Sequence, residues 1–415
     1  MTDDTHTAVR QPGGQAAALH PKQLLWLPFF ALIALSFFLG TSEFIVVGIL
    51  PELSDGFQVS LTVAGSVVTA FAFTYALGTP FLAALAGRFI RFRYMMILLI
   101  IFAAANLLSA FAPNFALFVL ARMVTAIVSG TLVSIALTFA PDIAPPASMA
   151  MVISGIFSGF SVASVFGVPI ATGITQAFGW RASFLFIFVA SLLLIALLFA
   201  VLPRRDHNQA QGILRQFRIF GDKRILLGCL TVVCGAGATY TFYTYLTPIF
   251  QTELGIPVAL TSAALLVFGI AAIISNVSSG VIAGRWGLSI MPRVYAIQLV
   301  FMLLLTFVAG KLLFGAVVIF VLGVLMYLMN SPIQLHFLQT AEQDHPDCVN
   351  LAASLNSVFF NFGIAFGSFC GGQIVGHAGL NFVGFGGALL AGCACLLCLA
   401  TLRSIKQREE VRHEA

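Results

Sequence analysis

Two charged side chains are predicted to lie well inside long apolar segments, and their chemistry is the most informative in the chain. Glu43 is the only acidic residue in such a segment, and Arg122 is the only basic one. A charge near the centre of a bilayer costs roughly 2.5–3.5 kcal/mol or more, so an arbitrary helix does not retain one. Because a low dielectric disfavours the ionised form of a carboxyl group, Glu43 can bind and release a proton, and we predict that it carries one. Arg122 stays charged, so it can pair with a bound molecule or bias the protonation of Glu43.

Each of these residues also has a plainer interpretation. Glu43 lies seven residues before Leu50, which is about 10 Å along a helix, so its side chain can reach the membrane interface. Arg122 lies seven residues into its segment and can act as a structural clamp between helices. The sequence leaves both interpretations open.

Uncharged polar residues occur in the apolar segments of the second half of the chain. Hydrogen bonding between helices is the usual role of any one of them, but together they can line a wet cavity. Since so few charges are buried, we expect a cargo that is neutral or weakly polar. The candidate cavity residues are Tyr240, Tyr243, Asn276, Asn330, Gln334, Asn356 and Asn361.

The composition shows what positions these residues. Only 8% of the 415 residues are charged and 60% are hydrophobic, whereas a soluble domain has about 25% charged residues. The surroundings must therefore be lipid, and we predict an all-α membrane protein with twelve transmembrane helices in two pseudo-symmetric bundles of six. The predicted spans are 24–50, 61–83, 94–112, 115–140, 148–172, 182–202, 225–250, 260–283, 293–310, 312–335, 350–375 and 380–402.

Most of the 20 basic residues fall in the segments that lie on the same side as the two termini. The positive-inside rule then places both termini in the cytoplasm. An even number of spans agrees with this arrangement. The predicted organisation is an N-terminal tail 1–22, a bundle 23–202, a linker 203–224, a second bundle 225–402 and a C-terminal tail 403–415.

A faint internal repeat supports two related halves. Ala86-Gly87-Arg88 follows the second span, and Ala283-Gly284-Arg285 follows the eighth. Internal repeats are typical of secondary transporters, in which two bundles rock about a central site. A receptor that does not transport would need a substantial soluble output domain, and the predicted tails are short.

The fifth span carries small residues four apart, which lets a neighbouring backbone approach closely. This predicted seam can be a fixed packing face or a surface that slides. Its residues are Gly155, Gly159 and Gly167, followed by Pro169.

No catalytic arrangement is recognisable. The sequence has neither a Gly-x-Ser-x-Gly motif nor a Walker phosphate loop, so we expect no enzyme and no ATP-driven pump. The seven cysteines include a tight cluster, Cys393, Cys395 and Cys398, but no histidine or carboxylate accompanies it, so we predict no metal site. A basic stripe interleaved with aromatic residues, as nucleic-acid binding requires, is also missing.

The chain resembles the major facilitator superfamily along almost its whole length, and within it the drug:proton antiporter group that includes sugar, arabinose and nucleoside efflux and chloramphenicol-resistance proteins. The most specific match is the run from Gly40 to Leu53, Gly-Thr-Ser-Glu-Phe-Ile-Val-Val-Gly-Ile-Leu-Pro-Glu-Leu. Gly167-Val168-Pro169 is similar to the antiporter signature, and 179–184 resembles the outer turn that follows it. The resemblance links Arg122 to proton coupling.

The loop after the second span departs from the family pattern. The family usually has Gly-x-Leu-Ala-Asp-Arg-x-Gly-Arg, where this chain reads Ala-Ala-Leu-Ala-Gly-Arg-Phe-Ile-Arg over 83–91. The acidic residue is replaced by Gly87, which puts the charge-relay latch of that loop in question. The basic residues of this conformational-switch loop remain, namely Arg88, Arg91 and Arg93.

These observations predict a multi-pass protein of the bacterial inner membrane that exports a small organic compound (drug, sugar or nucleoside-like) by proton antiport. The expected partners are the small-molecule substrate, protons and the lipid bilayer, with no nucleic acid. We expect a monomer that uses the proton gradient and no cofactor. The alternative is a proton-coupled uptake symporter, or a uniporter, of a small neutral metabolite.

Overall fold

The computed structural model of the chain describes residues 24–86, 89–204, 218–308 and 310–414. Within these ranges it has twelve helices long and apolar enough to cross a membrane, as predicted. The tail 1–22, most of the linker 203–224 and Arg88 lie outside the described residues.

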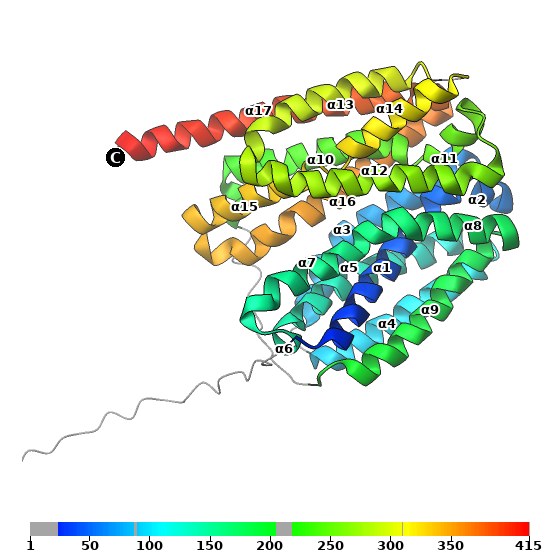
Figure 1. The fold of residues 1–415 in the computed structure, drawn as a ribbon, viewed down its shortest axis with the longest axis horizontal. Coiled ribbons are helices and arrows are strands. Elements are labelled where there is room, and N and C mark those ends of the chain that lie inside the picture. The colour runs from blue at the N-terminus through cyan, green and yellow to red at the C-terminus, as the bar shows by residue number, and fades with distance from the viewer. Residues whose placement is uncertain (1–23, 87–88, 205–217, 309, 415) are drawn as a thin grey trace, which may run out of the picture.

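The helices form two bundles that lie against each other, one drawn from blue to green and the other from green to red (Figure 1). The first bundle contains α1 (Trp26–Gly48), α2 (Leu50–Phe57), α3 (Leu61–Ala86), α4 (Arg91–Ala110), α5 (Phe115–Thr138), α6 (Ala140–Ile143), α7 (Met149–Val162), α8 (Val168–Phe178) and α9 (Trp180–Val201). The second contains α10 (Lys223–Tyr243), α11 (Leu246–Pro248), α12 (Val258–Arg285), α13 (Met291–Leu305), α14 (Leu312–Leu325), α15 (Asn330–Asp344), α16 (Val349–His377) and α17 (Val383–Glu414).

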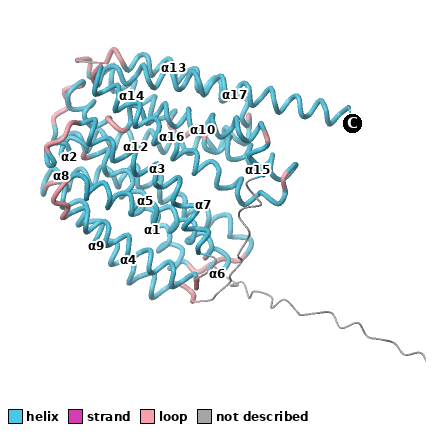
Figure 2. The backbone as a smooth tube through the Cα atoms, turned by 180° about the vertical axis from the view of Figure 1, so that it is seen from behind, coloured by secondary structure: helices cyan, strands magenta, loops and turns pink. Residues whose placement is uncertain are grey.

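Seen from behind, the described residues are helical apart from short connections (Figure 2). The helices α3 and α16 pack against each other across the two bundles, as do α8 and α12. In the fifth span a π-helical turn at 163–167 joins α7 to α8. Pro169 follows this turn, and because proline has no N–H it cannot complete the regular helical hydrogen bonds there.

Several predicted boundaries are wrong. The first span ends at Gly48, and a separate helix α2 follows, beginning next to Pro51. The tenth span continues as α15 to Asp344, so much of the loop predicted after residue 335 is helical. The last helix runs to Glu414, through the predicted tail 403–415, because that stretch is rich in Lys, Arg, Gln and Glu and has no glycine or proline to end a helix.

Four hydrogen bonds between the bundles lie at one end of the molecule, where α1, α8 and α16 end and α3 and α12 begin. Each joins a side-chain donor of one bundle to a backbone carbonyl of the other. The closely packed end of the molecule is therefore the one opposite the described C-terminus (Figure 1). The four donor–acceptor pairs are Thr62–Gly372, Gln176–Val258, Thr247–Val47 and Ser262–Pro169.

Candidate functional site

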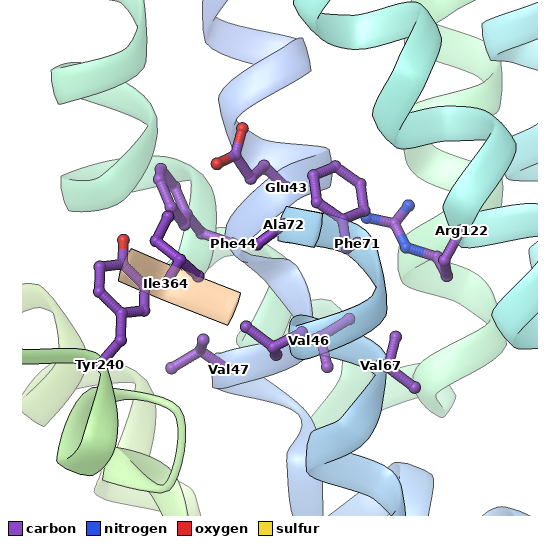
Figure 3. Close-up of a pocket in the computed structure, with 11 residues that line it drawn as sticks. Glu43, Phe44, Val46, Val47, Val67, Phe71, Ala72, Arg122, Tyr240 and Ile364 are labelled. Atoms are coloured by element: carbon purple, nitrogen blue, oxygen red, sulfur yellow. The ribbon is translucent and has the colours of Figure 1, made fainter. Parts of the chain in front are cut away.

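Glu43 lies in α1, five residues before that helix ends, between the two bundles. Its carboxyl group borders a small cavity of about 10 Å³ (Figure 3). The first bundle lines this cavity with residues of α1 and α3 and with Arg122 of α5, and the second contributes Tyr240 and Ile364. A cavity of this size holds roughly one water molecule.

Arg122 is buried, with 1% of its surface exposed, and it is bound to α1. One guanidinium nitrogen donates to the Ser42 hydroxyl at 3.0 Å, and the other donates to the Ser42 backbone carbonyl. The Ser42 hydroxyl in turn donates to the amide oxygen of Asn106 in α4 at 3.1 Å. The guanidinium group also lies over the rings of Phe71 and Phe184, at 4.8 and 5.5 Å from their centroids. Such contacts offset part of the cost of burying the charge.

Glu43 and Arg122 border the same cavity but do not pair. The Glu43 carboxyl group points away from the guanidinium group, and the Phe71 ring is drawn between them (Figure 3). Within the part of the chain that the structure describes, the Glu43 side chain makes neither a hydrogen bond nor an ion pair. An acid without a partner next to a small cavity is chemically suited to exchange a proton.

An aromatic cluster of the second bundle faces Glu43. Tyr240 lies perpendicular to Tyr243 and to Phe360, with ring centroids 5.2 and 6.0 Å apart. Tyr243 stacks on Phe268 at 5.3 Å, and Tyr327 stacks on Phe360 at 6.0 Å. The Tyr240 hydroxyl is buried and has no hydrogen-bond partner within the described residues. Sequence reasoning found Tyr240 and Tyr243 and missed Tyr327, Phe268 and Phe360, because nothing in the sequence distinguishes these from lipid-facing aromatic residues.

Glu43 and Tyr240 occupy equivalent positions in the two halves. The offset of 197 residues that relates the two Ala-Gly-Arg tripeptides also relates Glu43 to Tyr240 and Pro51 to Pro248. It further relates Ser42 to Thr239. Each of these hydroxyls bonds to an amide side chain of another helix in its own half, but Ser42 donates to Asn106 of α4, whereas Thr239 accepts from the Gln298 amide of α13 at 3.0 Å. The repeat therefore relates the two positions in the sequence, and the structure shows that both line the same cavity.

The remaining candidate cavity residues lie in different places. Asn276 of α12 donates to Ser161 of the other bundle, so it belongs to the surface between bundles. Gln334 donates to the Ala353 carbonyl at 3.2 Å, at an exposed position. The Asn356 amide of α16 lies 3.5 Å from the Asn330 carbonyl of α15, and the Asn361 amide donates to the Ser357 carbonyl at 3.1 Å within α16.

The loop arginines do not act as one group. Arg91 forms an ion pair with Asp142 of α6, donates to the Thr138 carbonyl at 2.6 Å and lies over the Phe139 ring at 4.1 Å. Arg93, in contrast, is exposed. Asp142, which follows the fourth span, thus pairs with Arg91 in this chain. The pattern that the chain resembles has its acidic residue within the loop itself, at the position of Gly87.

The small-residue seam packs within the first bundle. A Cβ added at Gly155 would come within 2.5 Å of the Phe29 ring, and one at Gly159 within 2.6 Å of the Ile33 carbonyl. One added at Gly167 would come within 2.1 Å of the Thr41 hydroxyl. The seam is therefore the contact face of the fifth span with α1. Pro169, by contrast, faces the other bundle, since its carbonyl accepts from Ser262.

A second cluster of charges lies at the linker end of the second bundle. Asp222 caps α10 through the Arg224 backbone N–H at 2.8 Å, and Arg224 also forms an ion pair with Asp344 of α15. His345 lies 3.2 Å from Asp222. Burial acts to raise the pKa of Asp222, but hydrogen bonds from Arg224 and His345 outweigh it and lower the pKa to about 2. These charges tie α10 to the end of α15.

The arrangement defines a class of protein. Twelve helices in two related bundles, with a half-buried acid in a cavity between them, form the architecture of a secondary transporter. Within the described residues, no group of three or more His, Cys, Asp or Glu side chains is placed to hold a metal ion.

Comparison with known proteins gives the family. Residues 32–350 match the Major Facilitator Superfamily model, and the chain belongs to that superfamily of membrane transporters. The chain is 31% identical over 382 residues to the uncharacterized MFS-type transporter YtbD of Bacillus subtilis (strain 168), covering 92% of this chain and 96% of that protein. It is 30% identical over 385 residues to the inner membrane transport protein YdhP of Escherichia coli (strain K12), covering 92% and 97%.

Solved structures share the fold at low sequence identity. A D-xylose-proton symporter superposes with a TM-score of 0.72 at 14% identity, covering 90% of this chain and 97% of that one. The nucleoside transporter NupG also gives a TM-score of 0.72 at 14% identity, with 91% and 99% covered. These similarities concern the fold. The family makes the protein a secondary transporter and not an enzyme.

Proposed function

We propose that the protein exports a small organic compound in exchange for protons by alternating access, as a member of the drug:proton antiporter group. The observation that carries the proposal is the unpaired carboxyl group of Glu43 in the cavity between the bundles. The bilayer disfavours a charge there, so the ionised form of Glu43 has a high free energy. Binding of a proton or of a ligand lowers that free energy. Glu43 is then the group at which proton and substrate binding compete.

Arg122 sets the electrostatic environment of that exchange. It is bound to Ser42, the residue next to Glu43 in α1, so movement of Arg122 and of α1 is coupled. A fixed positive charge near Glu43 favours release of the proton when the cavity is empty. The hydrogen bonds from Arg122 to Ser42 hold the guanidinium group away from the Glu43 carboxyl group, so the two side chains do not form an ion pair.

Alternating access is supported by the packing between the bundles. The four hydrogen bonds from side chains to carbonyls close the end of the molecule away from the described C-terminus. With the positive-inside orientation of both termini in the cytoplasm, this closed end faces outward. A relative named an inner membrane transport protein agrees with a location in the bacterial inner membrane.

The first experiment identifies a substrate and the direction of its flux. The full chain is expressed in a bacterium that lacks its own efflux pumps, and a panel of drugs, sugars and nucleosides is screened for reduced accumulation. Export that increases with an inward proton gradient supports antiport. Accumulation driven by the same gradient supports the alternative of an uptake symporter, and flux that ignores the gradient supports a uniporter.

The second experiment tests Glu43 in proteoliposomes with a compound from that screen. Glu43→Gln is expected to retain substrate exchange across the membrane and to lose the response to an imposed pH gradient. Glu342→Gln removes the same charge at an exposed position of α15 and is expected to leave the response intact. Equal coupling in wild type and Glu43→Gln contradicts the proposal.

A further inference from the structure

A groove on the lipid-facing surface of the second bundle shares no lining residue with the cavity beside Glu43. It lies between α13 and α17 and has a volume of about 420 Å³. Both helices belong to membrane spans, Gly287–Leu305 and Leu380–Arg408, so hydrocarbon surrounds the groove. In another protein, an engineered apolar cavity of about 150 Å³ binds benzene. The groove therefore has room for part of an acyl chain.

Side-chain size creates this groove. The helices α13 and α17 pack side by side (Figures 1 and 2). Between them, small residues leave space at Ala296, Ala388 and Gly392. Leu389 and Leu396 line the same space, with 70% and 69% of their surfaces exposed. Because these leucines are exposed, a chain in the groove contacts them without displacing any part of the protein.

Two arginines lie at the end of the groove that is nearer the described C-terminus. Arg293 of α13 precedes Ala296 by three residues, and Arg403 of α17 follows Leu396 by seven. Residues at these spacings share one face of a helix, so both arginines lie on the groove side. Both side chains are exposed, and within the described residues neither forms an ion pair. Their charges are therefore available to a ligand.

The two arginine side chains lean towards each other along the membrane normal. The helices α13 and α17 are the ninth and twelfth of twelve consecutive spans, so they run in opposite directions. The Cys395 thiol lies 3.4 Å from the Pro292 carbonyl, which places Arg293 level with Cys395. Arg403 lies eight residues beyond Cys395, about 12 Å along the helix. Side chains of a helix tilt towards its N-terminus, so each arginine leans into the interval between them.

We propose that the groove binds an anionic phospholipid, with one acyl chain between α13 and α17 and the phosphate group between Arg293 and Arg403. The planar guanidinium fork matches the oxygen atoms of a phosphate group. Basic pockets between transmembrane helices on the cytoplasmic side hold anionic lipid headgroups. A zwitterionic headgroup binds less tightly, because the arginines repel its cation. With both termini in the cytoplasm, as proposed, the lipid belongs to the inner leaflet.

The lipid site goes beyond the proposed function and does not depend on it. Both helices belong to the second bundle, so the lipid moves with that bundle during alternating access. Neither Glu43 nor Arg122 lines the groove, and proton coupling has no part in the assignment.

Native mass spectrometry of the purified full chain tests this assignment. The delipidated protein is titrated with phosphatidylglycerol and with phosphatidylcholine that carries the same acyl chains. The first phosphatidylglycerol is expected to bind at least tenfold more tightly than the first phosphatidylcholine. Arg293→Gln and Arg403→Gln are each expected to weaken the phosphatidylglycerol by about fivefold and to leave the phosphatidylcholine unchanged. Arg408→Gln removes the same charge at an exposed position further along α17 and is expected to change neither.

Variants of the groove test the place of the acyl chain. Ala296→Phe fills the groove and is expected to weaken both lipids severalfold, because the chain loses its place while the headgroup contacts remain. Ile297→Phe adds a ring at the neighbouring exposed position, which does not line the groove, and is expected to leave both affinities unchanged. Each variant is first shown to be monodisperse with an unchanged melting temperature, so that a folding defect is recognised.

Three outcomes overturn the inference: equal affinity of the wild type for the two lipids, an unchanged preference in Arg293→Gln/Arg403→Gln, or unchanged binding of both lipids in Ala296→Phe. Displacement of the lipid by millimolar inorganic phosphate would also overturn it, since a free anion lacks the chain. Glu43→Gln is expected to bind both lipids as the wild type does. A failure of proton-coupled export therefore leaves this result intact, and a failure of lipid binding leaves the proposed function intact.

Discussion

The hydrogen bond from Thr247 to the Val47 carbonyl is predicted to hold the closed end of the transporter shut. Pro51 has no N–H, so the carbonyl four residues before it loses its partner within the helix. That residue is Val47, and the Thr247 hydroxyl of the other bundle donates to it at 2.7 Å. The helix break that ends α1 thereby creates the acceptor that joins the two bundles.

The size of the effect follows from burial. Thr247 is fully buried and Val47 is 1% exposed, so water cannot replace the bond while this end is closed. Replacing Thr247 by valine keeps the shape and removes the donor. An unsatisfied buried carbonyl costs about 1–3 kcal/mol, which corresponds to a factor of about 5 to 150 in an equilibrium between closed and open forms of this end. In the open form water can bind the carbonyl, so the cost applies only to the closed form.

The assay is a distance measurement between the bundles. Spin labels are placed at Asn114 and Lys311, exposed positions in the loops before α5 and α14, in a background without the seven native cysteines. Pulsed electron paramagnetic resonance in nanodiscs then reports the fraction of molecules in which this end is open. Thr247→Val is expected to raise that fraction, and Thr247→Ser, which keeps the hydroxyl, is expected to leave it near wild type. Identical distance distributions in wild type and Thr247→Val would refute the reasoning.

Three further predictions concern stability. A lysine at position 122 cannot donate to the Ser42 hydroxyl and carbonyl in the same planar geometry as the guanidinium group. Arg122→Lys is therefore expected to lower the melting temperature measurably in a thermal scan in nanodiscs. An unchanged melting temperature would contradict a structural role of Arg122 in holding α1. Gly159→Ala places a Cβ against α1 and is expected to cost about 1–3 kcal/mol of stability, which is measured as a lower yield of monodisperse protein. Gly280→Ala is the control and is expected to be tolerated, because a Cβ added there meets no atom within 4 Å. The pKa of Asp222 is lowered from 3.8 to about 2, so its contribution to stability is complete above about pH 4 and is lost as the pH falls to about 2. Asp222→Asn is therefore expected to reduce the change in stability with pH in that window, as measured by acid unfolding. An acid-unfolding curve identical to that of the wild type would exclude the ion pairs of Asp222 as the cause of the pH dependence.

The membrane architecture could be predicted because hydrophobic length is a local property. A bilayer needs about twenty apolar residues per helix, so each span is visible in its own stretch of sequence. The boundaries that were wrong lie where a second local signal acts. Pro51 ends α1 and begins α2, and the helix-forming residues of 403–414 carry α17 past the end of its apolar segment.

The candidate site was predicted in part. Glu43 and Arg122 were identified because a charge in an apolar segment is costly wherever the helix lies. Phe71 separates the two side chains, and Arg122 is hydrogen-bonded to Ser42. Both arrangements depend on side-chain rotamers and on the packing of α1, α3 and α5. Asn276 bonds Ser161 across the bundles, a contact set by the register of α12 against α7, which the sequence does not contain.

The sequence by itself determined the solvent, the number of spans, the repeat and the presence of one acid inside the membrane, since each of these depends on residue type and spacing along the chain. The tertiary structure decided which groups meet. It brought Glu43 opposite Tyr240, 197 positions later in the repeat, and left the acid without a partner beside an aromatic wall. Side-chain contacts between helices arise from helix rotation and close packing, and sequence spacing within one helix does not contain that information.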